Sequence, residues 1–389
     1  MKKNVIILGS TGSIGKSTIK VLSKDKKNFK IRLLSTNRNS NTLVNQAIIF
    51  KVKNLIISDK IEFNKAKIKY KNLRINFFND FEIINKLFRK KEIDYSMVSI
   101  VGLDGLRPSL LLPKYSKSLA IVNKESLLSG WSLINSELTK YKTKFIPIDS
   151  EHFSISSLLN SPAQKNSIEK VFITASGGPF LNYSKKMLRK VTIKDALKHP
   201  NWRMGNKITI DSSTLMNKVF EVIEAKNIFN LSYNQISVLI HPNSYAHALL
   251  KFKNGPIKLL LHEPDMKIPI QNSIYDLDSK KLKTKEINFK ILNNLRFKFV
   301  NEKQFPLINI LKILPNQCSL YETVLLSIND FFVEKFLNKK ITYIELVNLI
   351  KKYALNKHFL SFRNKRIKSM SQIYKTREYV YLKLNNLSI

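Results

Sequence analysis

A glycine-rich turn near the start of the chain constrains the fold more than any other feature. Residues 5–8 are apolar and predict a buried strand, residues 9–15 read Gly-Ser-Thr-Gly-Ser-Ile-Gly, and a helical pattern follows. A strand, a glycine turn and a helix in this order are typical of the start of a dinucleotide-binding fold. Because the spacing is Gly-x-x-Gly-x-x-Gly and not the commoner Gly-x-Gly-x-x-Gly, a purely structural glycine turn is the alternative.

The first half of the chain continues as strands that alternate with helices. Further strand-like runs, in which most residues are apolar, lie at residues 31–34, 55–57, 98–101, 119–122 and 145–148. Such runs predict an α/β fold whose parallel sheet is covered on both faces and binds ligands beyond the carboxyl ends of its strands. We therefore expect a Rossmann-like domain at 1–148, an α+β catalytic domain at 149–275, a linker at 276–300 and a helical domain at 301–389.

The end of the second strand predicts the cofactor. Enzymes that use NAD commonly carry an acidic residue there to hold the ribose hydroxyls. Residues 35–39 instead read Ser-Thr-Asn-Arg-Asn, without an acid and with Arg38 suited to a 2′-phosphate. The sequence therefore favours NADPH.

Three acidic residues form a candidate metal site. Asp149 and Glu151 are two positions apart after a predicted strand, and Glu221 follows later in the chain. Carboxylates without a cysteine partner suit Mg²⁺ or Mn²⁺. Solvated or capping acids are the alternative for each position. The six histidines form no zinc-type pair on a predicted helix, so a zinc site is not expected.

Several segments near these acids suit a phosphate and a lid. Asn217 and Lys218 offer an amide and a cation, and Ser212 precedes them. Residues 176–178 read Ser-Gly-Gly and allow close backbone approach. Residues 199–205 place Trp202 between Pro200 and Gly205, which predicts either a lid or a loop anchored to the core.

Composition limits the class of protein. No apolar run approaches the roughly 18–20 residues that span a bilayer, and the single Cys318 excludes an intrachain disulfide. Both features fit a cytoplasmic protein. The net charge of +39 raises the question of nucleic-acid binding, but the Lys and Arg residues are spread along the chain beside many Asn and Ile. An AT-rich genome explains that pattern better, so we expect no nucleic-acid partner and no membrane partner.

Taken in order, these segments resemble the 1-deoxy-D-xylulose 5-phosphate reductoisomerase family. The motifs that carry the resemblance lie at residues 9–15, 123–126 (Asn-Lys-Glu-Ser), 149–152 (Asp-Ser-Glu-His), 175–180, 199–205, 216–221 (Met-Asn-Lys-x-x-Glu), 240–242 and 263–266. They cover about residues 1–270, whereas the C-terminal third matches loosely, with Asn329-Asp330 where Asn-Glu is usual.

The resemblance implies a role for each motif. The expected NADPH-binding residues are Gly9, Thr11, Gly12, Ser13, Ile14, Gly15, Asn37, Arg38, Asn39, Asn123, Glu125 and Gly205. The metal would be bound by Asp149, Glu151 and Glu221. The expected substrate and catalytic residues are Lys124, Ser150, Glu151, Ser176, His199, Ser212, Asn217, Lys218 and Glu221, and the lid and pocket residues are Trp202, Met204, His247 and Met266.

The implied reaction is an NADPH-dependent, metal-assisted rearrangement and reduction of 1-deoxy-D-xylulose 5-phosphate to 2-C-methyl-D-erythritol 4-phosphate, in isoprenoid precursor biosynthesis. A homodimer is implied in the same way. Two alternatives stay open: another NADP-dependent oxidoreductase, such as a semialdehyde or homoserine-type dehydrogenase, and a basic binding protein without catalysis. The sequence departs from the family pattern at Asn37, Leu103, Asp104, Phe153, His262, Lys267 and Ile268. At Asn37, where glycine is common, we expect a glycine-like backbone.

Overall fold

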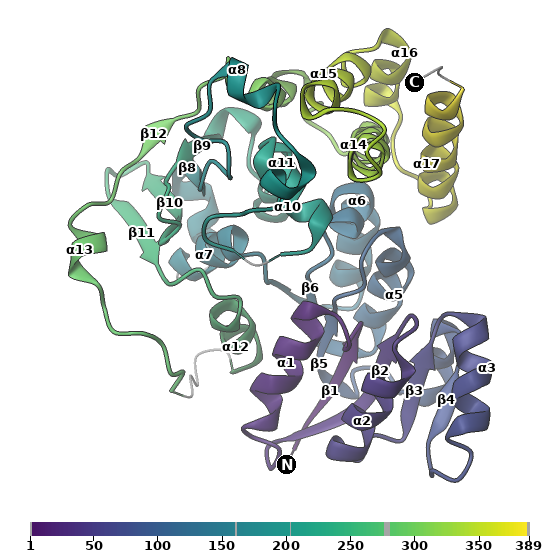
Figure 1. The fold of residues 1–389 in the computed structure, drawn as a ribbon. Helices are drawn as coiled ribbons and strands as arrows, with labels where there is room; N and C mark the ends of the chain where they lie inside the picture. Colours follow the sequence, from purple (N-terminus) through teal and green to yellow (C-terminus); the bar gives the residue numbers. More distant parts are fainter. Residues whose placement is uncertain (1, 160–161, 203, 276–280, 387–389) are drawn as a thin grey trace. The chain divides into compact units, whose positions relative to one another are not determined.

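The computed structural model describes residues 2–159, 162–202, 204–275 and 281–386. The chain forms two compact units, which Figure 1 shows with the sequence running from purple to yellow. The first unit comprises Met1–Asp149 and Met266–Leu282, and the second comprises Ser150–Asp265 and Lys283–Ile389. In the described residues, no helix is long and apolar enough to cross a membrane.

The first unit is built on a seven-stranded sheet in which every neighbouring pair of strands is parallel. Its strands are β1 (Lys3–Leu8), β2 (Phe29–Thr36), β3 (Asn54–Ile57), β4 (Asn76–Phe78), β5 (Ile93–Val98), β6 (Ser116–Ile121) and β7 (Lys144–Pro147). Their spatial order is β4-β3-β2-β1-β5-β6-β7. The order reverses between β1 and β5, and the crevice at such a reversal is where doubly wound sheets bind ligands.

Seven helices belong to the described part of this unit: α1 (Ser13–Ser23), α2 (Ser40–Phe50), α3 (Lys60–Lys69), α4 (Ile84–Leu87), α5 (Leu106–Leu111), α6 (Lys124–Lys140) and α12 (Lys267–Tyr275). Helix α12 comes from much later in the sequence than the other six and packs beside α1. The sheet and its helices thus form the Rossmann-like arrangement that the alternating pattern predicts.

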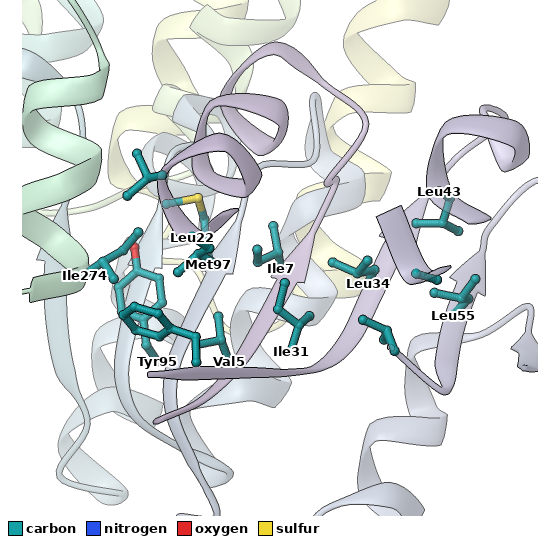
Figure 2. Packing of buried hydrophobic residues seen from close by; sticks show 14 of the residues in the cluster. Val5, Ile7, Leu22, Ile31, Leu34, Leu43, Leu55, Tyr95, Met97 and Ile274 are labelled. Carbon is teal, nitrogen blue, oxygen red and sulfur yellow. The ribbon is translucent and has the colours of Figure 1, made fainter. Parts of the chain in front are cut away.

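The core of this unit lies between the sheet and its helices. Figure 2 shows Val5, Ile7, Ile31 and Leu34 of β1 and β2 packed in one cluster with Ile274 of α12. The alternate residues Ile6, Leu8 and Leu33 are fully buried as well, so these two strands are covered on both faces, which explains why they are nearly all apolar. Burying so much aliphatic surface is the main favourable term in the stability of the unit.

Two strand expectations differ from the structure. The strand-like run at 98–101 marks only the end of β5, because the strand ends at Val98 and Val101 is 81% exposed. Strand β4 was not expected, since its three residues are too short to show a period. Both differences leave the parallel topology unchanged.

The second unit is built on a five-stranded mixed sheet in the order β11-β10-β8-β9-β12. Its strands are β8 (Ile168–Ala175), β9 (Ile236–Ile240), β10 (Ala246–Phe252), β11 (Ile257–Leu261) and β12 (Lys298–Phe299). Strands β8 and β9 are parallel, whereas the other pairs are antiparallel. This is the α+β architecture expected after residue 149.

The helices of the second unit are α7 (Ser150–Leu158), α8 (Lys185–Leu188), α9 (Ile193–Ala196), α10 (Asn206–Ser213), α11 (Met216–Phe229), α13 (Phe289–Leu292), α14 (Tyr321–Leu337), α15 (Tyr343–Ala354), α16 (Lys357–Leu360) and α17 (Met370–Asn385). The last four make the C-terminal part helical, as expected (yellow-green to yellow in Figure 1). Helix α14 packs against α15 and α17 through buried positions such as Val324 and Ile328.

The expected linker at 276–300 contains α13 and β12 in its described part, and residues 276–280 lie outside the described residues. The four-part division of the chain stays a prediction.

Candidate active site

The glycine turn of the first unit joins β1 to α1 and shows why glycine is needed at two positions. Gly9 has φ of +80°, and a Cβ there would lie 2.6 Å from the backbone oxygen of Ser99, which follows β5. A Cβ on Gly15 would lie 2.3 Å from the backbone oxygen of Gly9. These two glycines therefore let α1 begin directly against the turn, at the reversal point of the sheet.

Side chains from β2 and α2 brace the same turn. The backbone N–H of Gly9 donates to Ser35 Oγ (2.9 Å), and Ser10 Oγ donates to Gln46 Oε1 (2.7 Å). Thr11 and Thr36 share a hydroxyl–hydroxyl hydrogen bond of 2.6 Å. Sequence reasoning missed Gln46 because it lies on α2, far from the motif, and only a polar residue at a buried helix position could have pointed to it.

Helix α1 begins directly after the glycine-rich segment, and the first turn of this helix contains no acidic residue. Gly12 is the N-cap, Ser13 is the first helical residue, and Ile14 packs against the core. Such a terminus offers unpaired N–H groups and the positive end of the helix dipole to an anion. The expected residues of the turn are therefore together in one structural element.

The segment after β2 has an unexpected backbone. Asn37 is not among the described residues with positive φ, so the expectation of a glycine-like conformation was wrong. Its amide instead donates to Ser58 Oγ at 2.9 Å. Arg38 is 79% exposed and its Nε donates to Asp59 Oδ2 at 2.9 Å, while Asn39 caps α2.

Asn123 organises the segment after β6. Its side chain caps α6 by accepting from the N–H of Ser126 (2.6 Å), and its amide donates to the backbone oxygens of Ile100 and Gly102. The same amide donates to Glu125 at 3.0 Å. Asn123 thus ties the carboxyl ends of β5 and β6 together, which explains why an Asn stands there.

Lys124, the first residue of α6, donates to the carboxylate of Asp149. Both side chains are largely buried and have lost most of their contact with water. A charge-assisted hydrogen bond between them offsets this loss. Asp149 ends the first of the two segments of the first unit, and Glu151 lies two residues further along the chain.

A buried group of charges lies in the second unit, where α7 meets α11. Lys218 donates to Glu151 and to Glu221, the second at 2.5 Å. The side chains of Glu151 and Glu221 are 11% and 2% exposed. Ser150 Oγ also donates to Glu151 (2.6 Å), and Asn217 donates to Glu221. Two buried carboxylates so close together require a cation between them, which Lys218 supplies here.

Two residues beside this group, His152 and Glu224, had no expected role, although His152 belongs to the motif at 149–152. His152 is buried, and its Nε2 donates to the backbone oxygen of Glu221 at 2.9 Å, while Nδ1 lies 3.4 Å from Glu224 Oε2. These contacts fix α7 against α11 and therefore fix Glu151 relative to Glu221. The available signal was spacing, because Glu224 follows Glu221 by three residues on one helix face.

His199 holds the segment that follows α9. Its Nδ1 accepts the backbone N–H groups of Asn201 (3.2 Å) and Trp202 (2.9 Å), so Nδ1 carries no proton. Nε2–H therefore donates to Ser176 Oγ at 3.2 Å. Burial, and secondarily the charge of Lys218, lowers the pKa of His199 to about 4, which keeps the ring neutral at neutral pH.

The turn after β8 is positioned by the same histidine. Ser176 Oγ also accepts the N–H of Gly178 (3.1 Å), which leaves its own proton for a ligand oxygen. Gly177 and Gly178 have φ of +85° and +64°, and a Cβ on Gly178 would lie 3.0 Å from the backbone oxygen of Ser212. Ser176 and the end of α10 are thus brought together by a glycine contact.

The remaining expected residues lie in different places. Trp202 and Met204 are half-buried, Arg203 lies outside the described residues, and Gly205 is the N-cap of α10. His247 lies on β10 in ring contact with Trp202, with centroids 6.1 Å apart. Met266 belongs to the first unit and packs against its core.

A dinucleotide turn on a doubly wound sheet, together with a second unit that carries buried carboxylates and a lysine, defines the class of nucleotide-dependent oxidoreductases. Residues 5–130 match the family described as 1-deoxy-D-xylulose 5-phosphate reductoisomerase. Residues 145–229 and 261–380 match two C-terminal domain families of the same enzyme.

Individual proteins agree with these matches. The 1-deoxy-D-xylulose 5-phosphate reductoisomerase of Pelagibacter ubique is 50% identical over 388 residues, the full length of both chains. That of Clostridium tetani is 36% identical over 90% of this chain and 91% of its own. This chain belongs to the 1-deoxy-D-xylulose 5-phosphate reductoisomerase family, so the resemblance seen in the motifs is confirmed.

Solved structures match at the level of the fold as well. The Zymomonas mobilis enzyme in complex with NADPH has a TM-score of 0.88 at 25% identity and covers 99% of this chain and 98% of its own. A structure of DOX-P reductoisomerase with NADPH, fosmidomycin and magnesium has a TM-score of 0.89 at 28% identity, with 98% of both chains covered. The expected fold class is confirmed by these neighbours together with the two sheets.

Proposed function

We propose that this chain converts 1-deoxy-D-xylulose 5-phosphate to 2-C-methyl-D-erythritol 4-phosphate, with NADPH as reductant and a divalent cation as cofactor. The observation that carries the proposal is the buried group of Glu151, Lys218 and Glu221 in a chain of this family. The motif series argues against a semialdehyde or homoserine-type dehydrogenase.

The carboxylates fit a hard metal ion. Glu151 and Glu221 present oxygen donors from α7 and α11, and Asp149 stands two residues before Glu151. Oxygen ligands without thiolates suit Mg²⁺ or Mn²⁺, and a solved relative holds magnesium. We assign Asp149, Glu151 and Glu221 as its ligands. When bound, the ion supplies Lewis acidity to the oxygens of the substrate.

The first unit fits NADPH. The turn at 9–15 and the first turn of α1 would hold the pyrophosphate through backbone N–H groups. Exposed Arg38 would hold the 2′-phosphate, with Asn37 and Asn39 beside it. Asn123, Glu125 and Gly205 complete the assigned set.

The second unit fits a sugar phosphate. Ser176, His199, Ser212, Asn217 and Lys218 offer hydroxyl, imidazole, amide and ammonium donors, which suit the phosphate. The ammonium group of Lys218 can donate to carboxylates or to a phosphate. With a metal ion bound to Glu151 and Glu221, Lys218 would be available to donate to the phosphate of the substrate. Lys124 and Ser150 would bind the polar backbone of the substrate.

The carbon skeleton would rearrange by retro-aldol cleavage and recombination to a branched aldehyde, and NADPH, when bound, would supply the hydride that reduces this aldehyde. Trp202, Met204, His247 and Met266 would line the pocket and exclude water from the aldehyde. We also propose that the protein is a cytoplasmic homodimer with the four-part domain division given above, and that it has no nucleic-acid partner.

The decisive experiment follows NADPH absorbance with 1-deoxy-D-xylulose 5-phosphate and either Mg²⁺ or Mn²⁺. We expect metal-dependent oxidation of NADPH together with formation of 2-C-methyl-D-erythritol 4-phosphate. No oxidation above background with either metal would refute the proposed reaction.

The variant Glu151→Gln tests the metal assignment. It removes one charge from a proposed ligand, so Mn²⁺ binding, measured by electron paramagnetic resonance, and turnover should both fall by at least about 10-fold, the smallest loss typical of a residue that only supports a metal ligand. NADPH binding, measured by its fluorescence, should survive. Glu169→Gln, in an exposed pair with Lys251, is the matched control and should change neither. Equal Mn²⁺ binding in both variants would remove Glu151 from the site.

A further inference from the structure

Four aromatic rings of the second unit form a continuous series that ends at Trp202. Phe153 of α7 contacts His262 edge-on, with centroids 5.9 Å apart. His262 stacks on His247 of β10 at 3.9 Å and 17°. His247 in turn meets Trp202 edge-on at 6.1 Å and 69°. We call these four residues the ring row.

The two histidines of the ring row are held by backbone groups as well as by stacking. His247 Nε2–H donates to the backbone oxygen of His262 at 3.3 Å. His262 Nδ1–H donates to the backbone oxygen of Glu263 at 2.7 Å, and the N–H of His262 donates to Tyr245. Each ring therefore has a fixed tautomer and orientation, because a carbonyl oxygen can only accept.

A bulge in the β10–β11 pair aims His247 at the ring row. Ala246 pairs with Leu261 and Ala248 pairs with Leu260, so the register shifts at the intervening residue, His247. A bulge changes the direction of a side chain and is common beside functional sites. His262 follows the last residue of β11, directly beyond this bulge.

The middle of the ring row is suited to stacking and not to charge. The side chain of His262 is largely buried, and burial lowers its pKa, so that the ring is neutral at neutral pH. Nε2 of His262 is buried without a hydrogen-bond partner in the described structure. His262 therefore contributes mainly through its stacking contact with His247, and not through hydrogen bonds of Nε2.

Trp202, like His262, lies outside the helices and strands; it stands between α9 and α10. Its segment is otherwise held by His199 and by Asn201, whose amide donates to the backbone oxygen of Pro242 (2.6 Å) and to Ser244 Oγ (2.7 Å). These bonds hold the backbone of the segment, whereas the ring of Trp202 contacts the ring of His247.

We propose that His262 is a positioning residue, which holds the ring of His247 and, through it, the ring of Trp202 where the substrate binds. This inference rests on the proposed function for its effect on the substrate, but the positioning itself can be measured without catalysis. His262 would not touch the substrate, because His247 and Trp202 follow it in the ring row.

The test labels the holo protein, with NADPH and Mg²⁺, with 5-fluorotryptophan. The two tryptophans give two ¹⁹F resonances, which Trp202→Phe assigns. His262→Ala should shift and broaden the Trp202 resonance and leave that of Trp131 unchanged. The same variant should raise KM for the sugar phosphate by about 2- to 10-fold, the factor that one aromatic contact represents, at unchanged KM for NADPH.

His262→Phe keeps a flat ring and removes both ring nitrogens. It should restore the ¹⁹F spectrum and the KM of the wild type, a rescue that loss of stability alone would not give. His358→Ala, which removes a histidine that contacts Tyr379 on α17, is the control and should change neither.

An unchanged Trp202 resonance in His262→Ala would overturn the proposal, and so would a His262→Phe variant as defective as His262→Ala. If the wild type has no activity, the proposed function fails, but the ¹⁹F comparison still decides the positioning.

Discussion

Lys218 illustrates how one side chain can depend on distant parts of the chain. The sequence analysis assigned it to a phosphate, and the structure shows it donating to Glu151, which lies 67 residues away. A buried carboxylate without a cation loses several kcal/mol of hydration, so the folded chain brings the lysine to both acids. The sequence indicated Asn217 and Lys218 as neighbouring donors on one helix, but it could not indicate that Lys218 donates to Glu151 on α7.

At Arg38 we expect Arg38→Ala to reduce the preference for NADPH over NADH by about 10-fold, because a guanidinium bound to a phosphate is a charge-assisted pair. The measurement is the Kd of each nucleotide by fluorescence titration. Asp59 holds Arg38 from the end of β3, and the N–H of Glu62 together with Arg38 lowers the pKa of Asp59, so this anchor is ionised at neutral pH.

The control is Arg74→Ala, an exposed arginine that precedes β4 at the amino ends of the strands. If Arg38→Ala and Arg74→Ala show the same nucleotide preference, the 2′-phosphate is recognised elsewhere.

Glu322 predicts a pH dependence of stability. Its side chain is buried near the start of α14, and burial raises its pKa to about 7, although Ser319 donates to it. The folded chain therefore holds a proton that the unfolded chain has lost, so the stability that Glu322 contributes falls as pH rises from about 4.5 to 7. Glu322→Gln should remove this loss and raise the free energy of unfolding at pH 8 by roughly 1–3 kcal/mol.

Urea denaturation at pH 5 and pH 8 measures the effect. Glu345→Gln is a control of opposite sign, because the N–H and hydroxyl of Thr342 lower the pKa of Glu345, whose stabilisation is lost as pH falls. If Glu322→Gln shows the same pH dependence as the wild type, Glu322 is not the titrating group.

Among the elements, α10 and α14 are joined by a buried polar contact. Asn329 Nδ2 donates to Asp211 Oδ1 at 2.8 Å, and Lys207 lies 3.4 Å from Asp211 and 3.0 Å from Asp330. Asn329→Ala would leave a buried carboxylate with fewer donors and should lower the free energy of unfolding by about 1–3 kcal/mol. Asn338→Ala, at the exposed end of the same helix, should lower it far less. A midpoint in urea equal to that of Asn338→Ala would contradict the contact.

The sequence predicted elements where the signal is local. The turn at 9–15, with the strand before it and the helix after it, needs only seven residues and their neighbours. The end of β5 was misplaced because Ile100 and Val101 are apolar, although the strand itself ends at Val98. Phe153 and His262, two departures from the family pattern, contact each other, but a single sequence cannot show that two such distant residues are neighbours.

For the molecule as a whole, the first unit is discontinuous. Helix α12 buries Ile270 and Ile274 in its core, and Ser273 hydrogen-bonds Tyr95 at 2.8 Å. Residues 267–275 fell within the expected catalytic domain at 149–275, and no local pattern in the sequence indicates that they pack on α1. Long-range pairing of this kind is the part of a fold that periodicity leaves open.

A fragment of residues 1–149 should therefore be less stable than the same fragment joined through a flexible linker to residues 266–275. The loss of two buried isoleucines predicts a difference of at least about 2–5 kcal/mol in the free energy of unfolding, measured by urea denaturation. A linked segment with Ile270→Asp and Ile274→Asp is the control, because it adds the same length without the apolar contact. Equal stability of all three fragments would show that α12 is dispensable.

The late arrival of α12 also affects how the protein is made. A ribosome delivers the seven parallel strands first, yet the helix that completes their cover emerges only after Ser150–Asp265. Until then the nascent chain exposes an apolar face beside α1. Ribosomes add about 5–20 residues per second, so this exposure lasts for several seconds. During those seconds the unfinished sheet is a target for chaperones and for aggregation, so translation speed between these two segments becomes a determinant of yield.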